Sequence, residues 1–208
     1  MKIIFAFILA LLSWFAVIAQ YVLLVNNTDQ SVDESTIQFF SYFTILTNIL
    51  IAFYFSRKFL ILTKAIRGQI LPGALTALTV YIFIVGLLYQ ILLRHLWKPE
   101  GLQFLVDELL HSVIPVLVVI YWALYEKRHA VSYSHVLKFL PFPLFYCFLV
   151  LIRGQYSGFY PYPFIDGGKL SGMELMRNIG LLLLFFFLVS LVFVFIKKKQ
   201  APAHSVQR

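Results

Sequence analysis

Six long apolar segments dominate this chain and leave little room for any fold except a bundle of membrane-spanning helices. They lie near residues 3–25, 37–55, 72–93, 102–124, 137–152 and 175–196. Crossing a hydrocarbon core takes a helix of roughly 20 apolar residues. Charged residues make up only 12% of the 208, against about 25% in soluble domains, which excludes a separate soluble domain. We therefore expect an all-α polytopic membrane protein with a single six-span domain.

The basic residues predict how this bundle is oriented. Twelve of the seventeen fall on one predicted side: Lys2, Arg57, Lys58, Lys64, Arg67, Lys127, Arg128, Lys138, Lys197, Lys198, Lys199 and Arg208. Every acid except Glu126 falls on the other side. Because basic residues concentrate in cytoplasmic loops, we expect both termini to be cytoplasmic. The net charge of +8 is spread over short loops and a terminal lysine cluster, a pattern that favours anionic lipid headgroups over nucleic acid as the partner.

Two connections carry patterns of their own. Residues 56–73, "SRKFLILTKAIRGQILPG", alternate basic and apolar side chains, which predicts a short amphipathic helix at the membrane interface. Residues 154–172, "GQYSGFYPYPFIDGGKLSG", contain too much glycine and proline for a helix and are rich in aromatic side chains. We expect this segment to form a lid over the mouth of the bundle, with an ordinary loop of interfacial aromatic residues as the alternative.

The second apolar segment contains an unusual group of polar residues. The stretch "FTILTNIL", residues 43–50, places Thr44, Thr47 and Asn48 within a turn of one another. Counted from residue 37, Thr44 lies seven residues, or about 10 Å, into a helix. His111 lies seven residues after Phe104 in the fourth segment, so the same depth is expected for both side chains.

This shared depth predicts a pair of catalytic side chains. A threonine hydroxyl becomes a useful nucleophile when a neighbouring base accepts its proton, and neutral imidazole is suited to that role. We therefore predict Thr44 as nucleophile and His111 as general base. Asp107 and Glu108 precede the histidine by four and three residues, and either can orient the imidazole, with Asp107 preferred.

Each of these residues also has a purely structural interpretation. Thr44, Thr47 and Asn48 can bond to their own helix or fasten neighbouring helices together. Asp107 and Glu108 can lie among lipid headgroups at a helix end. A zinc site formed by these two acids with His95 and His111 is a further alternative, but no HExxH spacing is present, and we expect neither a metal nor an organic cofactor.

Three motifs in order, "YFTILTNIL", "LLHSVIPVL" and "YPYPFIDG", resemble the androgen-induced gene and androgen-dependent TFPI-regulating protein family, in its bacterial six-helix branch. The resemblance implies a threonine hydrolase of the bacterial cell membrane that cleaves fatty acid esters of hydroxy fatty acids. It assigns the essential threonine to Thr44 and the essential histidine to His111. It also carries over Tyr162, Pro163, Phe164 and Asp166 as the aromatic-Pro-Phe-acid loop. The spacing from His111 to Pro115 is one residue shorter than in the animal members.

The combined hypothesis is a lipid ester hydrolase with Thr44, His111 and Asp107 as catalytic residues. Thr47, Asn48 or backbone amides of the lid would stabilise the oxyanion, and Tyr162 and Asp166 are further candidates for contact with an acyl-ester substrate. A small proton-coupled transporter is one alternative, with the acids and the histidine as a relay. A binding or assembly protein, in which the polar residues only hold helices together, is another.

Overall fold

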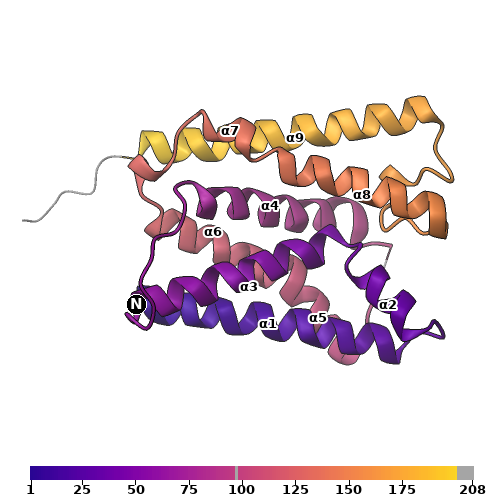
Figure 1. Cartoon of the computed structure of the whole chain (residues 1–208), viewed down its shortest axis with the longest axis horizontal. Helices are drawn as coiled ribbons and strands as arrows, with labels where there is room; N and C mark the ends of the chain where they lie inside the picture. The colour runs from indigo at the N-terminus through magenta and orange to yellow at the C-terminus, as the bar shows by residue number, and fades with distance from the viewer. Residues whose placement is uncertain (97, 201–208) are drawn as a thin grey trace, which may run out of the picture.

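The computed structural model describes residues 1–96 and 98–200, and these residues form a bundle of antiparallel helices (Figure 1). Six spans are long and apolar enough to cross a membrane: Lys2–Asn26, Phe43–Leu62, Ala74–Leu93, Gly101–Tyr125, His135–Ser157 and Gly172–Lys199. Within the described residues there is no strand. The prediction of an all-α, six-span membrane protein is confirmed.

Several spans combine more than one helical element. The longer helices are α1 (Lys2–Asn26), α3 (Phe43–Leu62), α4 (Ala74–Leu88), α6 (Ile114–Tyr125), α8 (Pro141–Ser157) and α9 (Gly172–Lys199). The shorter ones are α2 (Val32–Phe39), α5 (Gly101–Glu108), α7 (His135–Lys138), and the 3-10 turns η3 (Arg128–Ala130) and η4 (Pro163–Ile165). Two π-helical turns complete the spans: η1 (Tyr89–Leu93) continues α4, and η2 (Leu109–Val113) joins α5 to α6.

The predicted second span, 37–55, is wrong at both ends. The chain forms α2, breaks at residues 40–42 and begins α3 only at Phe43, while α3 continues to Leu62. The break has a tertiary cause: Ser41 Oγ donates to the carbonyl of Ile37 at 2.7 Å, and Tyr146 Oη donates to the carbonyl of Ser41 at 2.9 Å. Side chains thus replace the backbone partners that a continuous helix would supply.

The break also changes the predicted depth of Thr44. Thr44 is the second residue of α3, whereas His111 is the eleventh residue of its span. The count that gave the two side chains equal depth is therefore wrong.

Two predicted connections also differ. The amphipathic helix expected over residues 56–73 does not form: its first part is the end of α3, and residues 63–73 contain no helix. The segment expected to be non-helical from Gly154 begins four residues later, because α8 runs to Ser157. Gly154 is needed inside that helix, since a Cβ there would lie 2.0 Å from Cε1 of Tyr160.

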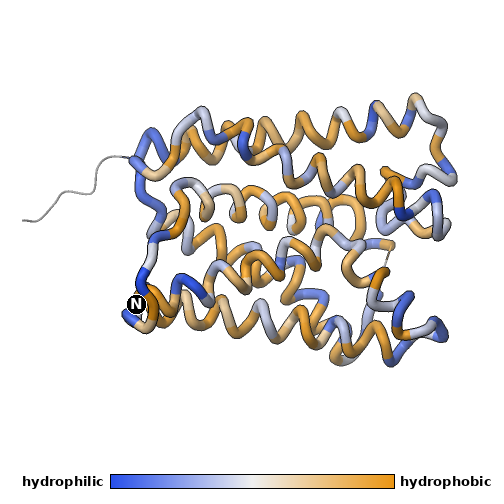
Figure 2. Tube along the Cα trace, in the orientation of Figure 1, coloured by the Kyte–Doolittle hydropathy of each residue, from blue (hydrophilic) through white to orange (hydrophobic). Residues whose placement is uncertain are grey.

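Polar residues gather at the two ends of the bundle (Figure 2). We call the end formed by residues 27–42, 94–96, 98–100 and 158–171 the acidic end. The opposite end, where α1 begins and α9 finishes, is the basic end (Figure 1). Arg208 lies outside the described residues. At the basic end Lys197 is turned inward and buried, with Nζ donating to the carbonyls of Trp122 and Ala123 at the end of α6. Its ammonium therefore caps a helix instead of meeting headgroups.

A cluster of apolar and aromatic side chains lies in the interior beyond the acidic end. It includes Ile51 and Phe55 of α3 and Val118 and Tyr121 of α6, and all four side chains are fully buried. Phe55 and Tyr121 pack edge to face, with ring centroids 4.8 Å apart. This ring contact joins α3 to α6 about three helical turns from Thr44 and from His111.

Candidate active site

A cavity of about 640 Å³ opens at the acidic end of the bundle. Its wall is built from α1, α2, α3, η1, α5, η2 and the two loops beside them. Four of the residues singled out in the sequence line it: Thr44, Asp107, His111 and Tyr162. Apolar side chains such as Leu23 and Ile45 form much of the remaining surface. Ligand sites commonly combine an apolar wall with a few convergent polar groups in this way.

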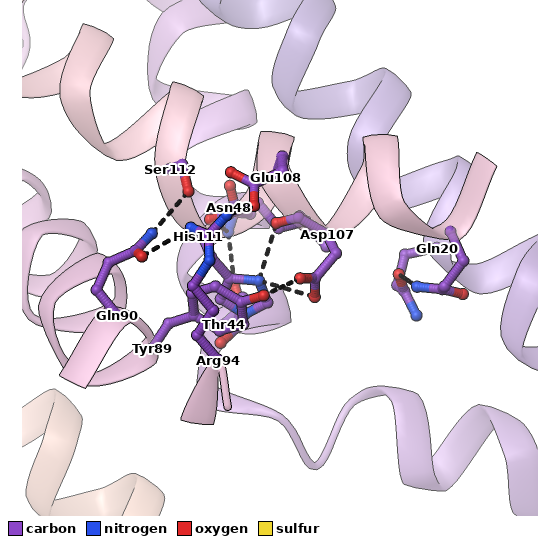
Figure 3. A network of polar contacts seen from close by, with 12 residues as sticks. Gln20, Thr44, Asn48, Tyr89, Gln90, Arg94, Asp107, Glu108, His111 and Ser112 are labelled. Carbon is purple, nitrogen blue, oxygen red and sulfur yellow. Dashed lines mark hydrogen bonds and ion pairs between the residues drawn. The ribbon is translucent and has the colours of Figure 1, made fainter. Parts of the chain in front are cut away.

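His111 is held in one orientation by Asp107, one helical turn earlier. The Nδ1 atom of the imidazole lies 3.0 Å from the Asp107 carbonyl oxygen and 3.2 Å from its carboxylate oxygen Oδ1. Both neighbours are acceptors, so Nδ1 carries the proton and Nε2 keeps its lone pair. Of the two acids that were open alternatives, Asp107 makes this contact (Figure 3). A carboxylate behind Nδ1 fixes the tautomer that a general base needs.

Tyr89 completes this group and was not anticipated from the sequence. Its ring stacks on the imidazole of His111, and its hydroxyl donates to Oδ2 of Asp107. Both Tyr89 and Asp107 are buried. The carboxylate is thus bonded on one oxygen to the histidine and on the other to the tyrosine, which leaves the imidazole little freedom to rotate.

Both rings belong to π-helical turns, since Tyr89 lies in η1 and His111 lies in η2. The two turns lie close enough for the rings to stack. The turn around His111 has a local cause in Pro115, four residues later. A proline has no N–H for the His111 carbonyl, and its ring crowds that carbonyl in a regular α-helix. The carbonyl lies against Gly86 of α4, where a Cβ would be only 3.0 Å from the oxygen. Single π-turns within α-helices are found frequently at functional sites.

Glu108 belongs to a second polar group on the other side of η2. Its carboxylate pairs with Arg94 at 2.5 Å. Arg94 also donates to Gln90 Oε1 at 2.7 Å, and Gln90 in turn donates to Ser112 Oγ at 2.8 Å (Figure 3). This chain of contacts ties the end of η1 to η2 and neutralises the charge of Glu108, while the Asp107 carboxylate remains available to the histidine.

Thr44 approaches the cavity from the first turn of α3. Among the described residues, its hydroxyl makes no hydrogen bond with His111. Its partner is the hydroxyl of Tyr162, which lies 3.4 Å from both Oγ1 and the backbone nitrogen of Thr44. The first amide groups of a helix have no carbonyl partner within the helix and carry partial positive charge. Thr44 therefore presents its hydroxyl and the first turn of α3 to the same cavity that His111 lines.

Tyr162 reaches this position from the loop between α8 and α9. It stacks on Phe164 with 5° between the rings and 5.3 Å between their centroids, and Asn178 Nδ2 fastens the Phe164 carbonyl to α9 at 3.0 Å. Burial raises the pKa of the Tyr162 hydroxyl above its ordinary value, although the hydrogen bonds with Thr44 act in the opposite direction. The phenol is therefore protonated and able to donate at neutral pH.

A second and much smaller cavity, of about 40 Å³, lies on the other side of Thr44 and Tyr162. Both residues line the two cavities. The rest of its wall is almost entirely apolar and comes mainly from α4, α8 and α9, including Val85, Leu182 and Phe186. His111 and Asp107 do not line it.

Thr47 and Asn48 lie away from both cavities. Asn48 Nδ2 donates to the carbonyl of Thr44 at 2.9 Å and to that of Leu110 at 3.4 Å, so it joins the first turn of α3 to the turn that carries His111. Thr47 is buried, and among the described residues its hydroxyl has no hydrogen-bond partner. Asn48 thus acts as a fastener between helices, and neither side chain is placed to contact a ligand in the large cavity.

Asp166 also lies outside both cavities. Its Oδ1 accepts a hydrogen bond from the amide of Gly168 at 3.0 Å, and its Oδ2 pairs with Lys169 at 3.2 Å. A short acidic side chain that accepts from the amide two residues later stabilises a turn. In this structure Asp166 shapes the loop that carries Tyr162.

Within residues 1–96 and 98–200, no three His, Cys, Asp or Glu side chains gather as metal ligands would. Glu108 and Asp107 have the partners described above. Comparison with models of protein families, with curated proteins and with solved structures finds no match to this chain.

Proposed function

We propose that this chain is a membrane-embedded hydrolase of lipid esters that uses Thr44 as its nucleophile. The observation that carries the proposal is the common cavity: the Thr44 hydroxyl and an imidazole whose Nδ1 is held by Asp107 line the same space. The resemblance of "YFTILTNIL", "LLHSVIPVL" and "YPYPFIDG" to the androgen-induced gene family supports the same two residues and suggests esters of hydroxy fatty acids as the substrate class.

The chemistry follows from the free lone pair on His111. As the Thr44 oxygen attacks the ester carbonyl, its proton passes to Nε2 of His111, directly or through one water in the cavity. The C–O bond to the alcohol then breaks, and the imidazolium returns the proton to the departing alkoxide. Water, activated by the same histidine, cleaves the acyl-threonine to a carboxylic acid and restores the hydroxyl. Asp107 stabilises the imidazolium in both steps.

The developing oxyanion has donors in place. The hydroxyl of Tyr162 lies beside Thr44 and accepts a hydrogen bond from its backbone N–H, and the N–H of Ile45 follows in the same first turn of α3. Donors that are fixed before the reaction stabilise a tetrahedral intermediate without reorganisation, and loss of one commonly slows catalysis about 10²- to 10³-fold. We place the Tyr162 hydroxyl and the Ile45 amide in this role instead of Thr47 and Asn48.

The transporter alternative is less well supported by the surroundings of the site. A proton relay needs polar groups that continue across the membrane. Beyond His111, the buried residues of α6 are Ile114, Pro115, Val118, Tyr121 and Trp122, none of which is an acid, a lysine, an arginine or a histidine. The assembly alternative accounts for Asn48, which joins two helices, but gives no role to the oriented histidine.

The test is covalent labelling of detergent-purified protein by a fluorophosphonate, which reports an activated hydroxyl. Thr44→Val and His111→Ala are expected to abolish labelling, and Thr44→Ser to retain it. Thr47→Val is the matched control, because it makes the same change one turn along α3, outside the cavity. Equal labelling of wild type and Thr44→Val, or no labelling of any protein, would contradict the hydrolase proposal.

A further inference from the structure

The two cavities that meet at Thr44 differ in both size and chemistry. The larger, about 640 Å³, contains the polar side chains and His111. The smaller, about 40 Å³, is lined by apolar groups such as Ile84, Val85 and Phe186. The hydroxyl of Tyr146, one of the few polar groups in that wall, is already bonded to the Ser41 carbonyl. Because Thr44 lies between the two cavities, an ester bound at its hydroxyl would have its acyl group in one cavity and its alcohol group in the other.

The position of the general acid, His111, determines which cavity holds the alcohol group and which holds the acyl group. In ester cleavage the alcohol leaves with a proton from the general acid, so the leaving oxygen must be on the side of His111. His111 lines the large cavity and not the small one. The alcohol half therefore belongs in the large cavity, and the carbon chain of the acyl half points past Thr44 into the small apolar cavity.

The size of the small cavity then limits the acyl group. A group the size of a water molecule needs roughly 10–15 Å³ of cavity volume measured in this way. The small cavity, of about 40 Å³, therefore accommodates about three carbon atoms. The wall includes buried side chains such as Phe43 of α3, Val85 of α4 and Tyr146 of α8, which a longer chain would have to displace. Packed side chains resist such displacement, so longer acyl groups are disfavoured.

We propose that the small cavity is an acyl subsite for short chains, and that the substrate is a short acyl group esterified to the hydroxyl of a larger lipid. This inference rests on the proposed hydrolase function and specifies its substrate. Thr44 accepts the short acyl group, the lipid alcohol leaves into the large cavity with the proton from His111, and water then releases a short carboxylic acid.

Leu182 of α9 offers a direct test, because it lines the small cavity while its neighbour Leu181 is 57% exposed on the outer surface of the bundle. The substrates are 4-methylumbelliferyl acetate, butyrate and octanoate, which keep the alcohol constant and vary only the acyl chain. For wild type we expect butyrate to exceed octanoate in kcat/KM by about tenfold or more. Leu182→Ala should raise the octanoate-to-butyrate ratio, and Leu182→Trp should lower butyrate relative to acetate.

The matched controls are Leu181→Ala and Leu181→Trp, which make the same changes outside the cavity and should leave the chain-length profile unaltered. Thermal unfolding of each purified variant verifies that it is folded. Hydrolysis with a profile that neither Leu182 variant shifts would overturn the acyl subsite and leave the hydrolase proposal standing. Absence of ester hydrolysis and of fluorophosphonate labelling in wild type would overturn both.

Discussion

The ring of Tyr89 lies parallel to the imidazole of His111, with 12° between their planes and 4.1 Å between their centroids. Because the Tyr89 hydroxyl also donates to Asp107, one side chain holds both partners of the histidine. Tyr89 also lines the large cavity, so it positions the histidine from within the site itself.

We expect Tyr89→Phe to slow fluorophosphonate labelling about tenfold, since the stacked ring remains while one hydrogen bond to the carboxylate is lost. Tyr89→Leu should slow it further, because the imidazole loses its stacking surface as well. Labelling rates of the purified variants measure both effects. Tyr125→Phe, near the basic end, is the control, and a Tyr89→Phe rate equal to wild type would show that the hydroxyl has no positioning role.

The two neighbouring acids should behave differently. Asp107→Asn is expected to reduce the labelling rate by roughly a thousandfold or more, because an amide can turn its N–H toward the histidine and favour the wrong tautomer. Glu108→Gln should reduce it only slightly, since Glu108 contacts Arg94 instead of His111. The same assay compares them. A larger effect of Glu108→Gln would favour the proton-relay alternative.

Gly86 allows α4 to approach the turn that carries His111. A Cβ at this position would lie 3.0 Å from the His111 carbonyl and 3.1 Å from Cβ of Pro115, and neither backbone nor proline ring can move easily. We expect Gly86→Ala to lower the thermal unfolding temperature. Gly180→Ala is the control: its Cβ would meet nothing within 4 Å, and alanine is favoured over glycine in a helix by about 1 kcal/mol. If Gly86→Ala matched Gly180→Ala, the close approach would have no energetic importance.

Tyr162 predicts a particular pH dependence. Burial raises the pKa of its hydroxyl above 10.0, so the protonated form is favoured by the fold. The contribution of this hydroxyl to the free energy of unfolding is fully present below the pKa that Tyr162 has in the unfolded chain. It is lost as the pH rises through the higher pKa of the folded state. Tyr162→Phe should slow labelling about 10²-fold near neutral pH, because an oxyanion donor is lost. Because the variant has no hydroxyl to ionise at this position, its stability should also fall less than that of wild type above pH 10. A Phe variant that labels at the wild-type rate would exclude Tyr162 as an oxyanion donor.

The expected cytoplasmic location of both termini stays a prediction, and it is directly testable. In a Cys147→Ser background, a membrane-impermeant maleimide applied to intact cells should label Gln30→Cys at the acidic end. It should not label Ser134→Cys at the basic end until the cells are opened. Both positions are exposed in the structure, so access depends on the side of the membrane. The reverse pattern would invert the orientation.

Hydropathy was sufficient to predict six spans, because the length of an apolar segment depends only on the chain itself. The break before Phe43 was not predictable, since it depends on a hydrogen bond from Tyr146, more than 100 residues away. The choice of Thr44 and His111 came from a depth count that the structure contradicts, from residue chemistry and from a family resemblance, and both residues line one cavity. Tyr89 was missed because tyrosine is common near helix ends in membranes, and Tyr162 was included only through the resemblance.

The π-helical turns at Tyr89 and His111 have a consequence for how such chains can vary. Each residue rotates an α-helix by about 100°, so removing one residue from a regular helix would turn every later side chain to a new face. A π-turn can instead take up the loss by tightening to an α-turn, leaving the helix on both sides in register. Loss of one residue from η1 or η2 would therefore move Tyr89 or His111 within its own turn and leave the rest of the span facing its present neighbours.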